Sequence, residues 1–383
     1  MLDLENYYQK TRQRSVLLCK PLKVEDYLPQ PETFVSPAKW NLAHTTWFFE
    51  EMVLKHFKKT HKVFHPDFSY LFNSYYNNIG DKNPRDNRGF ITRPGLDEIY
   101  QYRKFVDEKM LELIQSRPSE KCRELIVLGL NHEEQHQELL LTDLKYTFFQ
   151  NPVYPAYDLK NDFLSDKNKE SGWLKMQEGL YEIGFDGDGF SYDNEHKSHK
   201  VYLQDFQIAR QLVTNGEYLD FIEAGGYEDF NLWLDDGWAW KIEKDISQPL
   251  YWKKIEDEWF QFTLSGLRKI QGVQILAHIS FYEADAFARW KGMRLPTEFE
   301  WEAAADQLSW GKRWEWCNSA YLPYPGFKIA EGAVGEYNGK FMINQMVLRG
   351  ASVATTPGHS RKTYRNFFHP HLQWQYSGIR LAR

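Results

Sequence analysis

The sequence predicts an α+β protein of two domains, in which a helical bundle precedes a domain with little regular structure. The first observation is length, because 383 residues are enough for two or three domains that each bury a core. The second is a change of pattern: the first 150 residues show helical spacing of apolar side chains, whereas short β-like runs and Gly-rich turns follow Trp173. We therefore expect a bundle over 1–150, a linker over 151–171 and a second domain over 172–383.

Four helices are expected in the first domain, which suggests an antiparallel bundle. They cover about 2–18, 37–58, 96–116 and 119–149. The second has a clear start signal, with Ser36 at the N-cap and Pro37 at the first helical position. The stretch 58–92 is rich in Asn, Gly, Pro and Tyr, and a loop of this length in a compact domain is usually functional.

The second domain is expected to alternate short strands with two helical pieces. The β-like runs are Tyr181–Phe185, Lys200–Leu203 and Met346–Arg349, and the helical pieces lie near 214–224 and 280–290. The preceding linker is polar, contains two prolines and shows no periodicity.

Composition excludes several classes of protein. A net charge of −6 argues against a general nucleic-acid binder, which needs a concentrated basic surface. The first residues are polar rather than apolar, unlike a signal peptide, and the longest apolar runs are too short to cross a bilayer. Three cysteines without metal or redox spacing suit a reducing compartment, so we expect a cytoplasmic protein without a membrane partner. Homo-oligomerisation is left open.

Three histidines form a candidate metal site. His132 and His136 are four residues apart, so both project from one helix face, and that face also carries Leu125 and Leu139. His44 lies on another expected helix and shares its inward side with tryptophans. Two core histidines satisfied by neighbouring polar groups are the plain alternative for the pair, but a third inward histidine favours a metal. Three neutral imidazoles suit Zn, Fe(II), Cu or Ni.

Two further metal patterns are weaker. The segment from His132 to His136 also matches HExxH of zinc proteases, but no third ligand follows and Glu138 lies on the wrong helix face. An acidic turn could bind Ca2+, but it is too compact for an EF-hand loop, so a solvated turn is the favoured interpretation. Its residues are Asp186, Asp188, Asp193 and Glu195.

Several short motifs are distributed over both expected domains: Trp40–Thr45, His132–Glu138, Val213–Tyr218, Arg294–Trp301, Trp314–Trp316, Val347–Ser352 and Ser377–Arg383. Together they resemble those of the ergothioneine-biosynthesis sulfoxide synthases. This family joins a DinB-like four-helix bundle to a domain that resembles the formylglycine-generating enzyme, with a C-type-lectin-like architecture. The resemblance spans nearly the whole chain.

The resemblance implies a non-haem iron enzyme. In the family, Fe(II) is held by three histidines that correspond to His44, His132 and His136. Hercynine (trimethyl-histidine) and a thiol are the substrates, O2 is the co-substrate, and the product is a carbon–sulfur bonded sulfoxide. The metal binds and activates the reactants while the protein fixes their orientation.

The resemblance also assigns roles to residues that contact the substrates. Arg85 and Arg88 correspond to arginines that meet the carboxylate of the thiol, for which a planar guanidinium is well suited. Gln135 corresponds to a residue that contacts hercynine. Paired tyrosines in the long loop, Tyr75 and Tyr76, correspond to the proton or hydrogen donor in one branch of the family. Solvated surface arginines and loop tyrosines packed on the bundle are the plain alternatives.

A C-terminal loop completes the expected substrate contacts. Asn366 corresponds to a hydrogen-bond partner of the substrate, and Phe367 and Phe368 to rings that flank the trimethylammonium group by cation–π attraction. One of the two phenylalanines could instead anchor the C-terminal core. Branches that use γ-glutamylcysteine place an acidic residue where this chain has Phe368, so we expect free cysteine as sulfur donor.

Other functions are kept as alternatives. The same chemistry could use γ-glutamylcysteine or a selenosugar. A formylglycine-type oxidase needs a C-terminal cysteine pair, and residues 352–368 contain no cysteine. A DinB-like zinc thiol transferase leaves the second domain unexplained, and a non-catalytic binding module would hold no metal.

Overall fold

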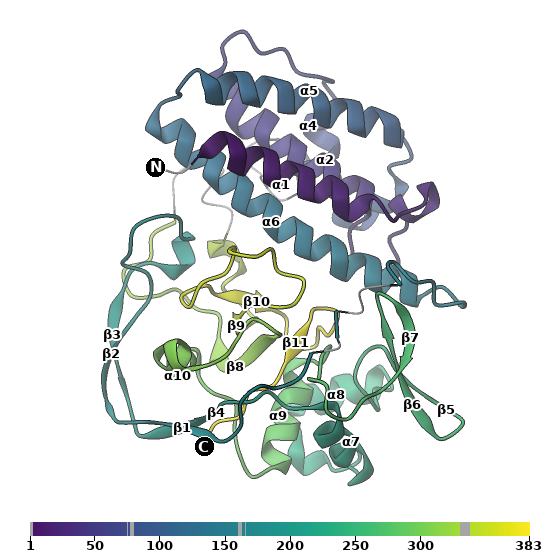
Figure 1. Cartoon of the computed structure of the whole chain (residues 1–383), viewed down its shortest axis with the longest axis vertical. Coiled ribbons are helices and arrows are strands. Elements are labelled where there is room, and N and C mark those ends of the chain that lie inside the picture. The colour runs from purple at the N-terminus through teal and green to yellow at the C-terminus, as the bar shows by residue number, and fades with distance from the viewer. Residues whose placement is uncertain (1–2, 75, 77–79, 160–162, 165, 330–337) are drawn as a thin grey trace. The chain divides into compact units, whose positions relative to one another are not determined.

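The computed structural model describes residues 3–74, 76, 80–159, 163–164, 166–329 and 338–383. The chain divides into two compact units (Figure 1). The first contains residues 1–157 and takes in 354–359, and the second contains 158–330, 337–353 and 360–383. One unit is helical and the other mixes helices and strands, so the expected α+β class with two domains is confirmed. The limits of the linker at 151 and 171 stay predictions.

The first unit is a bundle built on four long helical segments. Its elements are α1 (Leu4–Cys19), η1 (Val24–Tyr27), α2 (Ala38–Phe48), η2 (Phe49–Leu54), α3 (Lys55–Phe57), α4 (Phe68–Leu71), η3 (Arg85–Phe90), α5 (Leu96–Gln115) and α6 (Glu120–Phe149). Helix α6 packs against α1 and α2, and α2 also packs against α5 (Figure 1). The four expected helices are therefore present.

The second helix differs from its prediction in two ways. It begins at Ala38 with Pro37 at the N-cap, so the predicted cap at Ser36 is wrong; the Ser36 hydroxyl accepts a hydrogen bond from Arg88 Nη1 at 2.8 Å instead. It is also not a single α-helix, because α2 passes into the π-helix η2 before the short α3. Glu50 of η2 is buried, and accepts from Tyr102 Oη at 2.8 Å.

A buried ion-pair network joins α1, α5 and α6. The Glu133 carboxylate accepts from Arg12 Nη1 at 2.8 Å, from Ser15 Oγ at 2.5 Å and from Arg103 Nη2. Arg12 also reaches Asp107 at 2.6 Å. These groups are almost fully removed from water, apart from Asp107, so each charge depends on its partners.

The second unit contains short strands and helices. The strands are β1 (Trp173–Met176), β2 (Gly179–Ile183), β3 (His199–Leu203), β4 (Phe206–Ala209), β5 (Trp252–Ile255), β6 (Glu258–Thr263), β7 (Gly266–Lys269), β8 (Trp314–Ala320), β9 (Met346–Gly350), β10 (Asn366–Phe368) and β11 (Ser377–Gly378). The helices are η4 (Asp193–Glu195), α7 (Asn215–Glu223), η5 (Phe230–Leu232), α8 (Asp235–Glu243), α9 (Phe281–Trp290), α10 (Glu298–Ala304), η6 (Ala305–Gln307) and η8 (Gly339–Phe341).

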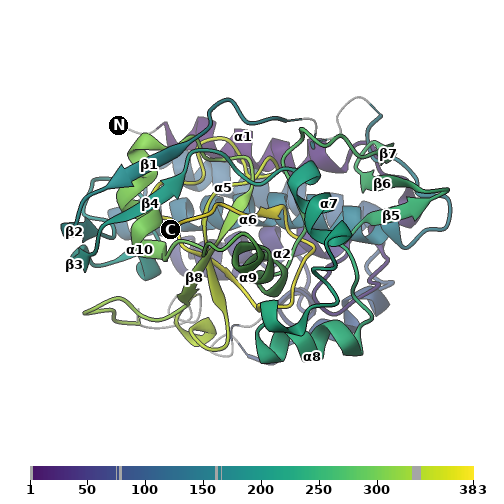
Figure 2. The same ribbon diagram turned by 90° about the horizontal axis from the view of Figure 1, so that it is seen from below.

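These strands form four small sheets rather than one large sheet. Strand β1 pairs with β4, β2 with β3, and β5, β6 and β7 form an antiparallel meander (Figure 2). The remaining sheet has the order β10-β9-β8-β11, with β11 parallel to β8. The expected strands at β2, β3 and β9 and the expected helices α7 and α9 are confirmed.

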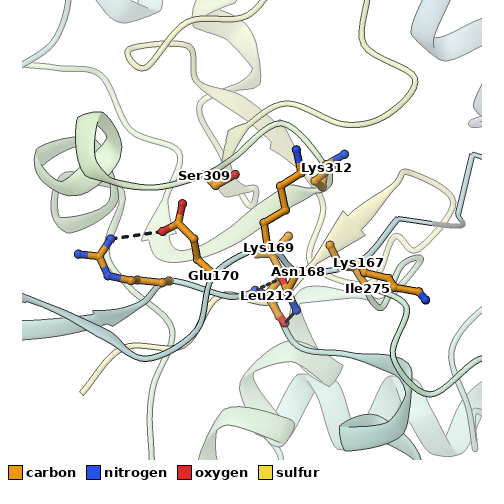
Figure 3. A pocket seen from close by; sticks show the side chains of 9 residues that line it. Lys167, Asn168, Lys169, Glu170, Leu212, Ile275, Ser309 and Lys312 are labelled. Carbon is orange, nitrogen blue, oxygen red and sulfur yellow. Dashed lines mark hydrogen bonds and ion pairs between the residues drawn. The ribbon is translucent and has the colours of Figure 1, made fainter.

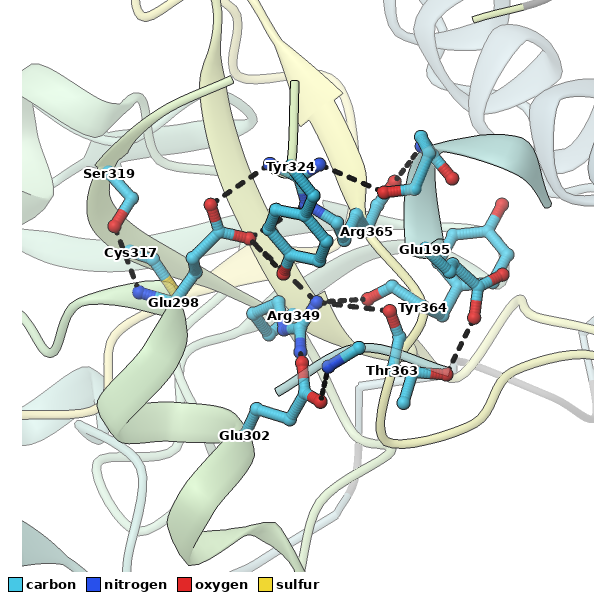
Figure 4. A network of polar contacts seen from close by, with 12 residues as sticks. Glu195, Glu298, Glu302, Cys317, Ser319, Tyr324, Arg349, Thr363, Tyr364 and Arg365 are labelled. Atoms are coloured by element: carbon cyan, nitrogen blue, oxygen red, sulfur yellow. Dashed lines mark hydrogen bonds and ion pairs between the residues drawn. The ribbon is translucent and has the colours of Figure 1, made fainter. Parts of the chain in front are cut away.

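Helix α10 contributes side chains to the core of the second unit. Its Trp301 is fully buried in the core cluster, and two of its three glutamates, Glu298 and Glu302, bind arginines from distant parts of the chain (Figure 4). Glu298 accepts from Arg365 at 2.8 and 3.0 Å, and Glu302 pairs with Arg349. These ion pairs attach α10 to β9, which carries Arg349, and to Arg365, which directly precedes β10.

Candidate metal centre

His44, His132 and His136 come together inside the bundle, as the sequence predicts. One ligand atom from each lies within 4.8 Å of the others, and they form the one such group of His, Cys, Asp or Glu found among the described residues. The Nε2 atoms of His44 and His132 are 3.2 Å apart. Two nitrogens that each lie about 2.0–2.1 Å from one ion can have this separation, so the donor set fits a metal.

The bundle positions the three imidazoles from two helices. His44 is on α2, and His132 and His136 are one turn apart on α6, against which α2 packs. His44 and His132 are buried, while His136 is half-buried. His136 is therefore the most exposed of the three ligands.

Hydrogen bonds on the far ring nitrogens orient two of the ligands. His44 Nδ1 lies 2.7 Å from the carbonyl oxygen of Phe72, and His136 Nδ1 lies 2.8 Å from Asn41 Oδ1. Both partners are acceptors, so each Nδ1 carries the proton and each Nε2 keeps a lone pair for a metal. Sequence reasoning missed both partners.

Burial keeps the three imidazoles neutral near pH 7. It lowers the pKa of His132 to about 4, and the pKa of His44 and of His136 well below the ordinary value. Electrostatic repulsion between the imidazoles lowers these pKa values further. His132 acts in this way on His44, and both His132 and His44 act on His136. A neutral imidazole is the form that binds a metal.

Aromatic rings and an arginine form a stack through His44. Trp40 lies parallel to the imidazole at 4.5 Å between centroids, and Trp47 follows at 5.5 Å. The Arg88 guanidinium lies 3.4 Å from the centroid of Trp40. At the other end, the buried Tyr76 ring lies 5.5 Å from Trp47. The stack fixes the plane of His44 and brings Arg88 and Tyr76 into the neighbourhood of the centre.

The long loop supplies much of this surrounding, as its length suggests. Phe72, Tyr76 and Arg88 all belong to it. Arg88 is buried and donates to the hydroxyls of Ser36 and Ser74, each at 2.8 Å. The predicted donor Tyr75 lies outside the described residues.

The two predicted arginines differ in setting. Arg85 is exposed and donates to the backbone carbonyls of Thr33 and Phe34, at 2.7 and 2.8 Å. Arg88 is buried against Trp40. Arg88 is therefore the better candidate to bind a substrate that enters the centre.

The zinc-protease interpretation does not fit this geometry. In HExxH enzymes the glutamate serves as the general base beside the metal. Here Glu133 faces α1 and α5, where Arg12 and Arg103 bind it. Burial alone would raise the pKa of Glu133, but the charges of Arg103 and Arg12 outweigh it and bring the pKa to about 2. A carboxylate held in this way is a poor base.

Helix α6 also carries contacts to a segment from the C-terminal part of the chain. Residues 354–359 belong to the first unit, and His359 Nδ1 lies 2.9 Å from Glu134 Oε2. Thr356 Oγ1 donates to Gln137 at 2.8 Å, and Thr355 Oγ1 donates to Glu138 at 2.8 Å. Glu138 is therefore directed to this segment and away from the histidines, as its helix position predicts.

The comparisons with known proteins cover both units. Residues 7–140 match the DinB superfamily, and residues 161–313 match the sulfatase-modifying factor enzyme 1-like domain. The chain is 26% identical to a hercynine oxygenase of Mycolicibacterium smegmatis, with 92% of each chain covered. The chain is thus similar to hercynine oxygenases over most of its length and has both of these domains. The resemblance inferred from the short motifs is thus confirmed.

Two further relatives extend this similarity. A hercynine oxygenase of Mycolicibacterium thermoresistibile is 24% identical, with 92% of this chain and 88% of that protein covered. The ergothioneine biosynthesis protein 1 of Schizosaccharomyces pombe is 23% identical, with 56% of this chain and 30% of that protein covered.

Within the described residues, no helix is both long enough and apolar enough to cross a membrane.

The remaining predicted contacts of this hercynine oxygenase homologue lie on α6 and β10. Gln135 is half-buried on α6, one residue before His136. Asn366, Phe367 and Phe368 form β10 in the second unit. Phe367 stacks on Tyr321 at 4.0 Å and packs against the core of that unit, as expected for a core anchor. Their contacts with substrate stay predictions.

The acidic turn in the second unit does not gather as a set of metal ligands. Glu195 is buried and binds Arg361 and Thr363 Oγ1, and Asp193 accepts from Asn338 Nδ2 at 2.5 Å. Asp186 and Asp188 are exposed. Two of the four carboxylates thus already serve protein partners.

A separate hollow in the second unit contains none of the predicted site residues (Figure 3). It is lined by Lys167, Asn168, Lys169, Glu170, Arg210, Leu212, Ile275, Ser309 and Lys312. Arg210 pairs with Glu170 across it at 3.4 Å. The centre in the bundle remains the candidate functional site.

Proposed function

We propose that this protein is an iron(II)- and O2-dependent sulfoxide synthase of ergothioneine biosynthesis, which joins the sulfur of a thiol to the imidazole of hercynine. The observation that carries the proposal is the group of three histidines, with ligand atoms within 4.8 Å of one another, in a chain that aligns over 92% of its length with a hercynine oxygenase. The ergothioneine biosynthesis protein of Schizosaccharomyces pombe supports the same pathway.

The reaction balances with O2 as the oxidant. The imidazole loses one C–H bond and the thiol loses its S–H bond, while a C–S bond and an S–O bond form. The second oxygen atom leaves with both hydrogens as water. Bound iron would supply coordination positions for the reactants and the redox chemistry with O2.

Residues of this chain would hold, orient and protonate the reactants. His44, His132 and His136 would bind the metal as neutral ligands, and the tryptophans around His44 would exclude water from that side. The Tyr76 hydroxyl, with Tyr75 as the other candidate, would donate a proton or hydrogen atom. An apolar surrounding strengthens the electrostatic interactions of the reacting groups.

Arg88 would set the orientation of the thiol substrate. Its guanidinium is buried, donates to two serine hydroxyls and lies over the ring of Trp40, which stacks on the ligand His44. A carboxylate of the thiol could bind such a preorganised fork, and Arg85 would assist from the loop surface. Gln135 would contact hercynine.

Residues of the second unit complete the proposal. Asn366 and Phe368 are the proposed contacts of hercynine, and Phe367 is the weaker candidate because Tyr321 already covers one face of its ring. Phe368 stands where an acidic residue would meet the amine of γ-glutamylcysteine, so cysteine is the proposed donor.

The proposal is tested by aerobic incubation of Fe(II)-reconstituted protein with hercynine and either cysteine or γ-glutamylcysteine, followed by mass spectrometry. A sulfoxide adduct from cysteine alone is expected. An adduct from γ-glutamylcysteine alone would keep the reaction class and reject the donor. No adduct from either thiol, with iron bound, would reject the proposed function.

A further inference from the structure

The side-chain amide of Asn41 occupies a fixed place between the start of α2 and the metal centre. Asn41 is 3% exposed and lies three residues before His44 on the same helix. Its Nδ2 donates to the carbonyl oxygens of Ser36 and Pro37, at 3.2 and 3.4 Å. Both carbonyls belong to residues just before the first turn of α2.

These two bonds decide which end of the amide faces His136. An amide nitrogen has only donors and a carbonyl oxygen only accepts, so the nitrogen must point to the two backbone carbonyls. The orientation is thus set by the hydrogen-bond network. Oδ1 is left to face His136 Nδ1, at 2.8 Å.

The orientation of the amide determines the tautomer of His136. Because Oδ1 can only accept, the proton of the neutral imidazole must sit on Nδ1, and the lone pair must sit on Nε2. The other tautomer would place two lone pairs against each other at 2.8 Å. The same arrangement is made for His44 by the Phe72 carbonyl, but there the acceptor is backbone and no single substitution can remove it.

Asn41 also links the two helices that carry the ligands. Helix α2 provides His44 directly and, through Asn41, fixes the ring of His136 on α6. His136 is the half-buried member of the three, so packing restrains its ring least. A hydrogen bond has most effect on orientation where packing is weakest.

We propose that Asn41 is a positioning residue of the metal centre, which holds His136 in the Nδ1–H tautomer and directs its Nε2 toward the position shared with His44 and His132. The inference rests on the proposed function in so far as a metal occupies that position. Groups that orient a ligand in this way typically contribute 10- to 100-fold to metal affinity or activity.

The tautomer is tested on metal-free protein by 15N NMR of histidine-labelled chain. We expect His136 as the Nδ1–H tautomer in the wild type and loss of that preference in Asn41→Leu, which has a similar volume but no acceptor. A wild-type His136 that is protonated at Nε2, or an unchanged tautomer in Asn41→Leu, would overturn the inference. This readout requires neither metal nor catalysis.

Metal affinity is tested by anaerobic Fe(II) titration of the full chain. Asn41→Leu should weaken binding about 10- to 100-fold, whereas Asn41→Asp, which keeps an oxygen acceptor, should stay within a few-fold of wild type. The control is Asn131→Leu, because Asn131 is similarly buried on α6 but, among the hydrogen bonds of the described residues, donates only to the Val127 carbonyl of its own helix.

The outcomes separate this inference from the proposed function. If Asn41→Leu and Asn41→Asp weaken Fe(II) binding equally, the amide acts only through its hydrogen bonds at the start of α2. If Asn41→Leu binds Fe(II) with wild-type affinity, the amide does not act on the metal. Either result overturns the positioning role and leaves the proposed function intact. A wild-type chain that binds no Fe(II) rejects the proposed function, while the NMR experiment still decides the tautomer.

Discussion

At the scale of residues, the three candidate metal ligands could be predicted from the sequence, but the orientation of their imidazole rings could not. Helical spacing placed His132 and His136 on one face, and the inward side of the second helix placed His44 opposite them. The acceptors of their Nδ1 protons are an amide on a neighbouring helix and a backbone carbonyl in the long loop. No periodicity predicts where a loop carbonyl lies, so Phe72 could not be found from the sequence.

The buried guanidinium of Arg88 leads to a prediction about thiol recognition. Arg88→Met should raise KM for cysteine and lower kcat/KM about 10- to 100-fold, as expected when a charge-assisted hydrogen bond of about 1.5–3 kcal/mol is lost. Steady-state kinetics with cysteine and with cysteamine, which lacks the carboxylate, would measure it. The effect should largely disappear with cysteamine. An equal loss with both thiols would show that Arg88 acts through its packing on Trp40.

Glu133 leads to a prediction about stability and pH. Glu133→Gln should lower the free energy of unfolding by about 3–5 kcal/mol, because two buried arginines lose their shared carboxylate. Iron binding by the folded variant should persist, since Glu133 faces away from the histidines. Urea unfolding and Fe(II) titration of the variant check both statements; loss of iron from a stably folded variant would contradict the assigned role.

The pH dependence of this contribution follows from the direction of the shift. The folded-state pKa of Glu133 is depressed from 4.5 to about 2, so its stabilisation is fully present above pH 4.5. It is lost as the pH falls from 4.5 toward 2, by about 3 kcal/mol at most. The difference in stability between wild type and Glu133→Gln should narrow over that range, and a constant difference would show that the folded-state pKa of Glu133 is not depressed.

At the scale of elements, long periodic helices were predictable and short strands were not. Helices α5 and α6 match their expected ranges within one residue, because each repeats its apolar pattern over several turns. Strands such as β10, with three residues, and β11, with two, are too short to show alternation. The π-helix η2 was missed because its wider turn depends on the buried Glu50 and its tertiary partners rather than on local propensity.

The contact between α2 and α6 gives a prediction at this scale. A Cβ added at Gly129 would lie 2.7 Å from ring atoms of both Phe48 and Phe49, which are buried and cannot yield easily. Gly129→Ala should therefore lower the free energy of unfolding by about 1–3 kcal/mol, although alanine favours helix by about 1 kcal/mol. Iron affinity should also fall, because Phe48 packs against His132 at 5.0 Å.

Glu124→Ala is the control for this substitution. Glu124 is exposed on the same helix, so its replacement should change stability by less than about 0.5 kcal/mol. Thermal unfolding and Fe(II) titration of both variants would make the comparison. If Gly129→Ala is as stable as Glu124→Ala, then α2 and α6 adjust their packing without a loss in the free energy of unfolding.

At the scale of the whole molecule, the two-domain architecture followed from the change in pattern along the chain, but the sharing of residues between units did not. Residues 354–359 lie far along the sequence and yet belong to the bundle unit. Their contacts with Glu134, Gln137 and Glu138 span more than 200 positions. Local patterns carry no information about such contacts.

These contacts predict that the C-terminal part of the chain stabilises the bundle. His359→Phe should lower the free energy of unfolding by about 1–3 kcal/mol, because the buried Glu134 carboxylate loses a partner. The control is His369→Phe, since His369 is exposed and contacts only the Asn344 carbonyl among the hydrogen bonds described. Denaturant unfolding of the two full-length variants decides the matter, and equal stabilities would contradict the prediction.

The central claim is that His44, His132 and His136 together hold one iron ion, and anaerobic equilibrium dialysis against Fe(II) tests it most directly. Wild type and His369→Ala should retain one iron per chain, and His44→Ala, His132→Ala and His136→Ala should each retain none at the same free iron concentration while remaining folded. Retention of iron by a folded variant that lacks any one of the three, at the affinity of the wild type, would contradict the account.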